Sequence, residues 1–349
     1  MAKQTSLAAL NDETDVPSVA VLVLTYNQED FIQPCLESLV ALNYAALKIW
    51  VLDDGSTDAT AARAREFART APKEIHLIEQ DNSGGHISGN LQTLLESSEG
   101  EYILFMSGDD MLGPAFPLEK TVRALEGDPR IALMLARAVP FAADPTMRMQ
   151  NIYRPDLLQL LNAGDARQLL EQHLYVQVSR LNLQGMVVRR TVTERMGGFD
   201  TDLIADDYAF FMRVFGEMVS TGMRFCFDPD ALWLYRLHGA NVHRVTRRQF
   251  TLVAEVVAKY VPADRWRAFR WDTMGMDSLQ DWEWARQKTA ELFGAEHAPQ
   301  ITRRFANASI KAARRRRDRN ALLAFASMNY LTFRQRAHAA VSLVPAWFG

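Results

Sequence analysis

Uninterrupted apolar runs alternate with amphipathic stretches along the first part of the chain. The apolar runs predict strands over residues 18–24, 48–52, 75–78, 102–106 and 131–138. The stretches between them predict helices over residues 31–41, 56–70, 90–98 and 117–126. Strands that are apolar throughout are typical of a parallel sheet that is buried on both faces. The alternation therefore predicts an α/β fold with a mostly parallel, Rossmann-like sheet and helices on both faces.

The pattern changes further along the chain. Periodicity is weak over residues 141–179, as expected of a segment that shapes a variable pocket. Strand-like and helical segments then follow at residues 181–190, 191–196, 208–215, 225–228 and 231–237. After Val245 the segments are helical, as at 250–261 and around 281–284. We expect a mobile N-terminal tail, an α/β domain and a C-terminal helical region, at residues 1–16, 17–245 and 246–349.

Pairs of acidic residues follow two of the predicted buried strands. Asp53-Asp54 comes after the second strand, and Asp109-Asp110 comes after the fourth. Ligands of open α/β sheets bind at the carboxyl ends of strands, where paired carboxylates and a glycine can seat a divalent cation that carries phosphates. A single pair would more often be a turn or a helix cap. Two such pairs favour a site, and a third pair, Asp206-Asp207, precedes a predicted helix.

A glycine-rich loop at residues 81–89 does not match a known phosphate-binding motif. Gly84 and Gly89 have the spacing of a P-loop, but Asn90-Leu91 stands where that motif has Lys followed by Ser or Thr. The first strand is followed by Thr-Tyr-Asn rather than by the glycines of a dinucleotide-binding fold. We therefore expect a nucleotide to be held through carboxylates and a metal ion.

Composition excludes several classes of protein. The chain has 349 residues, of which 48% are apolar and 23% charged, and its net charge of −3 argues against a general nucleic-acid binder. Cys35 and Cys226 have no metal-binding spacing and are expected in the core. Because the sequence shows neither a signal peptide nor an apolar run that could span a membrane, we expect a cytoplasmic protein.

A basic run lies near the C-terminus. Between residues 303 and 319 there are eight Lys or Arg residues and one acid, Asp318. A solvated helix face accounts for such a run. The alternative is peripheral contact with the anionic inner face of the cytoplasmic membrane, helped by apolar residues in 322–333 and 341–348. The sequence leaves both interpretations open.

Five motifs resemble successive signatures of family 2 glycosyltransferases. They are Val21-Leu-Val-Leu-Thr-Tyr-Asn27, Asp53-Asp-Gly-Ser-Thr-Asp58, Gly100-Glu-Tyr-Ile-Leu-Phe-Met-Ser-Gly-Asp-Asp110, Met196-Gly-Gly-Phe-Asp200 and Ala205-Asp-Asp207. The resemblance covers about Pro17 to Asn241. It implies the GT-A fold, an inverting reaction, a nucleotide-sugar donor that is most often UDP-linked, and a Mg²⁺ or Mn²⁺ ion.

The resemblance also implies which residues bind the donor. The set consists of Thr25, Tyr26, Asn27, Asp53, Asp54, Asn90 and Asp109. Thr25, Tyr26 and Asn27 match the segment that lines the base pocket. Asp53 would accept a hydrogen bond from uracil, while Asp54 and Ser56 support its loop. Asp109 would lie toward the ribose.

Metal and base positions follow from the same resemblance. Asp110 would bind the ion that bridges the two phosphates, and His238 resembles a late histidine that reaches the metal in some members. Asp207 falls where the family keeps its general base. Four positions depart from the family pattern. Ser107 stands where a third acid is frequent, Gly89 where an arginine often precedes the asparagine, Asp206 where a glutamate is usual and Leu24 where a proline is frequent.

The leading hypothesis is a metal-dependent inverting glycosyltransferase that extends a cell-envelope glycan on a glycan or lipid-linked acceptor. A metal would stabilise the leaving diphosphate, and a positioned carboxylate would take the proton of the attacking hydroxyl. A sugar nucleotidyltransferase is disfavoured, because it would want a basic glycine-rich loop after the first strand. A non-catalytic nucleotide-sugar-binding scaffold is suggested by Ser107, whereas Asp207 argues against it.

Overall fold

The computed structural model describes residues 16–142, 153–177, 181–203, 207–238, 246–276, 278–329 and 331–342. The expected tail at 1–16, the expected boundary at Val245 and the apolar segment at 341–348 lie wholly or largely outside these residues. The chain divides into two compact units. One comprises Met1–Arg167 with Arg180–His238, and the other combines Gln168–Ser179 with Gly239–Gly349. The expected domain limits themselves stay a prediction.

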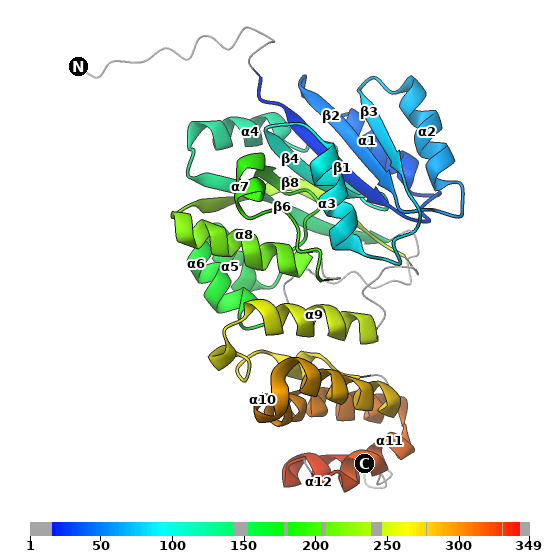
Figure 1. Ribbon diagram of the computed structural model, residues 1–349, viewed down its shortest axis with the longest axis vertical. Helices are drawn as coiled ribbons and strands as arrows, with labels where there is room; N and C mark the ends of the chain where they lie inside the picture. Colours follow the sequence, from blue (N-terminus) through cyan, green and yellow to red (C-terminus); the bar gives the residue numbers. More distant parts are fainter. Residues whose placement is uncertain are drawn as a thin grey trace, which may run out of the picture. The chain divides into compact units, whose positions relative to one another are not determined.

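Four parallel strands form one half of an eight-stranded sheet in the first unit (Figure 1). They are β1 (Val19–Thr25), β2 (Leu47–Asp53), β3 (Ile75–Glu79) and β4 (Tyr102–Ser107), in the order β3-β2-β1-β4. The apolar runs predicted all four, and the structure confirms them. Thr25 aligns with Asp53, and Leu24 aligns with Ser107. The two acid pairs therefore emerge at the same edge of the sheet.

The other half of the sheet is mixed. Short β7 (Val187–Arg189) lies antiparallel between β4 and β6 (Ile131–Ala142), β6 runs parallel to β8 (Arg224–Leu237), and β5 (Met111–Leu112) closes the edge against β8. The strand predicted over 181–190 was therefore too long. The two closing strands predicted over 225–237 are one strand, interrupted by a register shift from Asp228 to Leu232. Pro229 lies in this shift and has no N–H to donate to a ladder.

The helices that follow in the chain up to residue 221 were mostly predicted. They are α1 (Ile32–Val40), α2 (Thr60–Thr70), α3 (Ile87–Ser97), α4 (Leu118–Gly127), α5 (Pro155–Ala163), α6 (Ala166–Leu169), α7 (Arg190–Arg195) and α8 (Asp207–Thr221). α2 begins four residues later than residue 56, where its start was predicted. Asp58 precedes this helix and accepts a hydrogen bond from Thr60 N at 2.9 Å. α3 starts earlier than predicted because His86 Nδ1 accepts a bond from Gly89 N and caps it.

The second unit is helical around an aromatic core. It contains η2 (Leu170–Leu174), α9 (Thr246–Tyr260), two short 3₁₀ helices (Ala263–Arg265 and Trp271–Thr273), α10 (Leu279–Arg316), α11 (Arg319–Ser327) and α12 (Phe333–Val341). Ring centroids of Trp282 lie 4.8 Å from Phe305 and 5.1 Å from Phe325. Gly294, with φ of +69°, breaks α10 into two helical segments. None of the helices in the described ranges is both long and apolar enough to cross a bilayer.

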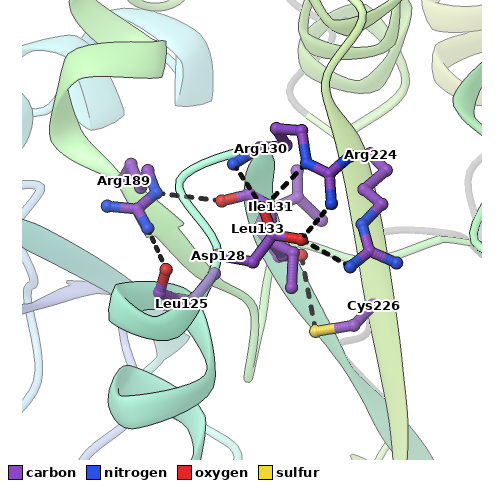
Figure 2. A network of polar contacts seen from close by, with 8 residues as sticks. All are labelled: Leu125, Asp128, Arg130, Ile131, Leu133, Arg189, Arg224 and Cys226. Atoms are coloured by element: carbon purple, nitrogen blue, oxygen red, sulfur yellow. Dashed lines mark hydrogen bonds and ion pairs between the residues drawn. The ribbon is translucent and has the colours of Figure 1, made fainter.

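An arginine network ties β6, β7, β8 and α4 together at one end of the mixed half-sheet (Figure 2). Arg189 Nε donates to Ile131 O at 2.9 Å, and its Nη2 donates to Leu125 O at the end of α4. Asp128 accepts from Arg130 and Arg224, each through Nη2, at 3.0 and 2.6 Å. These two guanidinium groups lower the pKa of Asp128. The network adds a side-chain donor to Leu125 O at the end of α4 and to Ile131 O at the start of β6.

Replacing Arg189 by Ala should destabilise the first unit. The guanidinium is mostly buried and bonds two backbone carbonyls, so we expect the free energy of unfolding to fall by about 1–3 kcal/mol. Arg123→Ala is the matched control, because that side chain is exposed and pairs with Glu119 on the same helix. Urea unfolding measures both variants. Equal stabilities of the two variants would contradict this account of the network.

Candidate active site

Two loops at the carboxyl edge of the sheet interlock through Asn27. Its backbone N donates to Ser56 Oγ at 2.8 Å, and its side-chain Oδ1 accepts from Thr57 N at 2.8 Å. Asn27 adopts a left-handed conformation with φ of +50°. Asparagine tolerates this conformation better than most residues. The loop after β1 is thereby fixed to the loop after β2.

Asp53 and Asp54 both point into the protein. Asp53 is 3% exposed and closes its own turn, accepting from Ser56 Oγ at 2.6 Å and from Ser56 N at 2.9 Å. Asp54 is 4% exposed and reaches the loop after β3, where it accepts from Gln80 Nε2, Ser83 N and Ser83 Oγ. This first acid pair therefore shapes the two loops that follow β2 and β3.

Asn90 belongs to the same buried network. Its Oδ1 accepts from Gln80 Nε2 at 2.9 Å, and its Nδ2 donates to Ser83 Oγ at 3.0 Å. The structure thus brings Asp54 and Asn90 together through Gln80 and Ser83. Sequence analysis missed these two connecting residues, although the glycine-rich stretch that contains Ser83 marked the loop.

Thr25 and Tyr26 differ in exposure. Thr25 is buried, and its Oγ1 donates to Gln28 Oε1 at 2.8 Å, whereas Tyr26 is 45% exposed. Gly108 of the second acid motif lies directly against Thr25 and Gln28. A Cβ at Gly108 would come within 2.6 Å of Gln28 Oε1 and 2.7 Å of Thr25 Oγ1. Glycine therefore lets the turn carrying Asp109 and Asp110 approach the loop after β1 without displacing these side chains.

Asp109 and His238 meet although they are far apart in sequence. Asp109 Oδ2 lies 2.9 Å from His238 Nε2. Ser107 Oγ donates to the other oxygen of Asp109 at 2.5 Å. The imidazole also packs on Phe31, with ring centroids 4.8 Å apart. Both side chains are partly exposed, at 13% and 18%, so this pair keeps an open side.

Asp110 instead faces inward and holds β8. It is 2% exposed, its Oδ2 accepts from Trp233 Nε1 at 3.0 Å, and its Oδ1 accepts from Arg236 N at 2.8 Å. Burial raises the pKa of Asp110 well above its usual range, and the nearby charge of Asp109 adds to this. Both carboxylate oxygens are engaged by donors from β8. Sequence analysis expected a metal ligand here and did not foresee this structural task.

Arg236 brings a positive charge to the same place. Its Nε donates to Asp109 O at 2.8 Å. The guanidinium lies between two aromatic rings, 4.9 Å from the centroid of Phe31 and 4.7 Å from that of Phe141. Stacking of this kind orients an arginine without neutralising it. No sequence motif had marked Arg236, apart from its position two residues before His238.

Asp207 is the first residue of α8. Its Oδ1 accepts a hydrogen bond from Leu183 N at 3.2 Å. Its neighbour Asp206 lies outside the described residues. The role of Asp207 as a base stays a prediction.

The residues present fit a Mg²⁺ or Mn²⁺ ion that arrives with a diphosphate. Within the ranges that the structure describes, no group of three or more His, Cys, Asp or Glu side chains could hold a metal. Asp109 and His238 nevertheless supply one carboxylate and one imidazole at a partly open position. Mg²⁺ sites in phosphate-transfer enzymes are typically built from one or two carboxylates, substrate phosphates and waters. A site to which the protein contributes two ligands is therefore consistent with this ion.

Comparison with known proteins decides the family. The family described as "Glycosyl transferase family 2" matches residues 20–196, which is just over half of the chain. The chain belongs to this family. The resemblance drawn from its motifs is thereby confirmed.

Individual relatives agree with the assignment. The uncharacterized glycosyltransferase YibD of Escherichia coli K12 is 24% identical over 239 residues, which cover 66% of this chain and 64% of that protein. The chain thus matches less than two thirds of the length of this relative.

Solved structures share the fold. Mannosyltransferase PcManGT from Pyrobaculum calidifontis, in complex with GDP-Man and Mn²⁺, has a TM-score of 0.55 at 21% identity and covers 95% of this chain and 88% of its own. TarS 1–349 from S. aureus, in complex with UDP-GlcNAc, has a TM-score of 0.51 at 17% identity and covers 93% and 89%. The predicted GT-A fold with a C-terminal helical region is confirmed.

Replacing Asn27 should separate its two structural contributions. Asn27→Gly keeps the left-handed conformation accessible and loses the bonds to Thr57, whereas Asn27→Ala also introduces backbone strain. We expect Asn27→Ala to lower the free energy of unfolding by about 1–2 kcal/mol more than Asn27→Gly does. Urea unfolding of both variants measures the difference. If Asn27→Gly were the less stable variant, the strain argument would be wrong.

Proposed function

We propose that this glycosyltransferase is metal-dependent and inverting, and moves a sugar from a nucleoside-diphosphate donor, preferably UDP-linked, to a hydroxyl group. The acceptor is a glycan or a lipid-linked sugar of cell-envelope polysaccharide synthesis. The observation that carries this proposal is the meeting of Asp109 and His238 beside the interlocked loops after β1 and β2. The metal and donor found with PcManGT and the donor found with TarS support it.

Donor binding is assigned to the loops at the carboxyl edge of the sheet. Thr25, Tyr26, Asn27 and Asp53 come from the two loops that interlock, where a planar base would be received. Asp54 and Asn90 act at one remove, because they set the loop after β3 through Gln80 and Ser83. The exposed Tyr26 is the member of this set that is best placed to contact a ligand.

The metal ligands in this proposal are Asp109 and His238. Asp110, expected as a ligand from its motif position, is given the task of holding Trp233 and Arg236 in place. A bound divalent ion would stabilise the charge that develops on the leaving diphosphate, typically by several kcal/mol. Arg236 adds a fixed positive charge next to the same pair.

Proton removal is assigned to Asp207. A carboxylate on the face of the sugar opposite the leaving diphosphate takes the proton of the acceptor hydroxyl as it attacks the anomeric carbon. One displacement from that face inverts the configuration. The reaction then requires no covalent bond between enzyme and sugar.

Donor binding should depend on both the metal and the Asp109–His238 pair. We expect wild type to bind one of UDP, GDP, dTDP or CDP in calorimetry, and to bind it more tightly with Mn²⁺ present. Asp109→Ala and His238→Ala should each weaken the Mn²⁺-dependent binding by about tenfold or more. Asp264→Ala is the control, because this aspartate is 81% exposed in the second unit. Binding of none of the four nucleotides would favour a degenerate, non-catalytic site.

Asp207→Asn should abolish turnover without abolishing donor binding. Asparagine keeps an oxygen that can accept from Leu183 N, so the start of α8 should stay in place. Loss of a general base lowers the rate by roughly 10²–10⁴-fold. The measurement is release of nucleoside diphosphate from the preferred sugar donor, alongside calorimetric binding of the diphosphate. Release at the wild-type rate would remove Asp207 from the mechanism.

A further inference from the structure

Three arginines and a glutamine surround a hollow in the second unit. The hollow has a volume of about 360 Å³ and is lined by Arg267, Gln300, Arg303 and Arg304. All four belong to the helical unit, so the hollow is described independently of the donor site. Its described lining residues carry three positive charges and no carboxylate. Such a lining favours an anionic ligand.

Helix geometry explains why three of these residues converge. Gln300, Arg303 and Arg304 follow Gly294 and Pro299 in the second segment of α10, and spacings of three and four residues put them on one face. Lys311 and Arg315 continue the same face at positions 11 and 15 residues after Gln300. The basic run seen in the sequence therefore begins at the hollow.

Arg267 is brought to this face by packed aromatic residues. The neighbouring Trp266 donates its Nε1 to Val261 O at 2.8 Å, and its ring lies 5.0 Å from Phe293 and 5.2 Å from His297 of α10. The segment that carries Arg267 is thus fixed to the helix. The arginine is exposed, so its charge is accessible at the rim of the hollow.

Arg304 brings to the hollow a donor that no described protein group satisfies. Its Nε is buried and makes no hydrogen bond within the part of the chain that the structure describes. Asp272 lies close enough for its charge to be felt, but that carboxylate is held by Arg270 through bonds of 2.9 and 3.1 Å. A buried donor without a partner is costly, and a ligand oxygen would remove that cost.

The position of Arg303 on α10 is also fixed. Gln335 of α12 donates its Nε2 to Arg303 O, and Gln335 is itself held in a capping box with Thr332. The arginine side chains of the hollow therefore stand on a helix whose place beside α12 is set.

We propose that this hollow binds a phosphate group. Guanidinium groups present paired N–H donors that match phosphate oxygens, and three of them around one hollow give both charge and direction. Gln300 adds an amide donor that is indifferent to charge. The phosphate belongs either to a soluble phosphorylated molecule or to a lipid headgroup.

The test compares two triple variants of equal charge. Arg267→Gln/Arg303→Gln/Arg304→Gln removes the lining, while Arg317→Gln/Arg319→Gln/Arg334→Gln removes three exposed arginines of the same unit that do not line the hollow. Inorganic phosphate and glycerol 2-phosphate are titrated at low salt with EDTA, which keeps metal away from the donor site. We expect the lining variant to bind about tenfold more weakly or worse, and the control to stay within about threefold of wild type.

Vesicles then identify the source of the phosphate. Wild type and the two triple variants are each floated with phosphatidylglycerol vesicles and, for comparison, with phosphatidylcholine vesicles. Flotation that only the lining variant loses assigns the site to a headgroup, whereas soluble binding without flotation assigns it to a soluble phosphate ester. Equal loss in both triple variants would mean general charge attraction and would overturn the proposal.

Folding and the donor site are checked separately. The single variant Arg267→Gln changes an exposed residue and should weaken phosphate binding about threefold or more even if the triple variant folds poorly. Nucleoside-diphosphate binding with Mn²⁺ should be unchanged in every variant, so failure here leaves the proposed reaction standing. Wild type that binds neither phosphate probe and does not float with phosphatidylglycerol vesicles would also overturn the proposal.

Discussion

The buried carboxylate of Asp110 is the interaction on which the geometry of the site depends. A carboxylate that is 2% exposed must be satisfied by donors, and Asp110 takes them from Trp233 and from the backbone of Arg236. Both donors lie on β8, so the bonds fix where this strand passes the end of β4. His238 follows two residues later and therefore arrives beside Asp109. Asp110 therefore positions the strand that brings His238 to Asp109.

The carboxylates of the first acid pair are also buried, but their hydrogen-bond donors come from loops and not from a strand. Asp53 and Asp54 both accept hydrogen bonds from N–H and O–H groups of the loops. With Asn27 they join three successive βα loops into one rigid edge. Loops that are ordered in advance lose less conformational freedom when a ligand binds.

Local patterns predicted the parallel half of the sheet well. Each of these strands is an uninterrupted apolar run, and the pairing of β1 with β2 and β4 follows from βα alternation. Long-range features escaped prediction. Two strands were expected where one strand with a register shift exists. The backbone bond from Arg270 N to Val176 O ties the segment that begins at Gln168 to the rest of the helical unit.

The sequence predicted which residues belong to the candidate site better than it predicted how they are arranged. The family resemblance assigned Asp110 and His238 to the metal and Asp109 to the ribose side, whereas the structure places Asp109 and His238 2.9 Å apart. The motifs gave no means of telling which acid of a pair points inward. That depends on Trp233 and Arg236, which lie on a strand more than 120 residues away. Gln80 and Ser83 were missed for the same reason, since their roles come from tertiary contacts.

The central claim is that Asp109 and His238 bind the metal, whereas Asp110 holds β8 in place through Trp233 and Arg236. Diffraction from crystals grown with Mn²⁺ and the preferred nucleoside diphosphate, collected at the manganese edge, tests it directly. The account predicts an anomalous peak within about 2.3 Å of Asp109 Oδ2 and His238 Nε2, with the Asp110 bonds to β8 intact. A peak coordinated by Asp110 in place of Asp109, or a bound diphosphate with no manganese beside it, would contradict it.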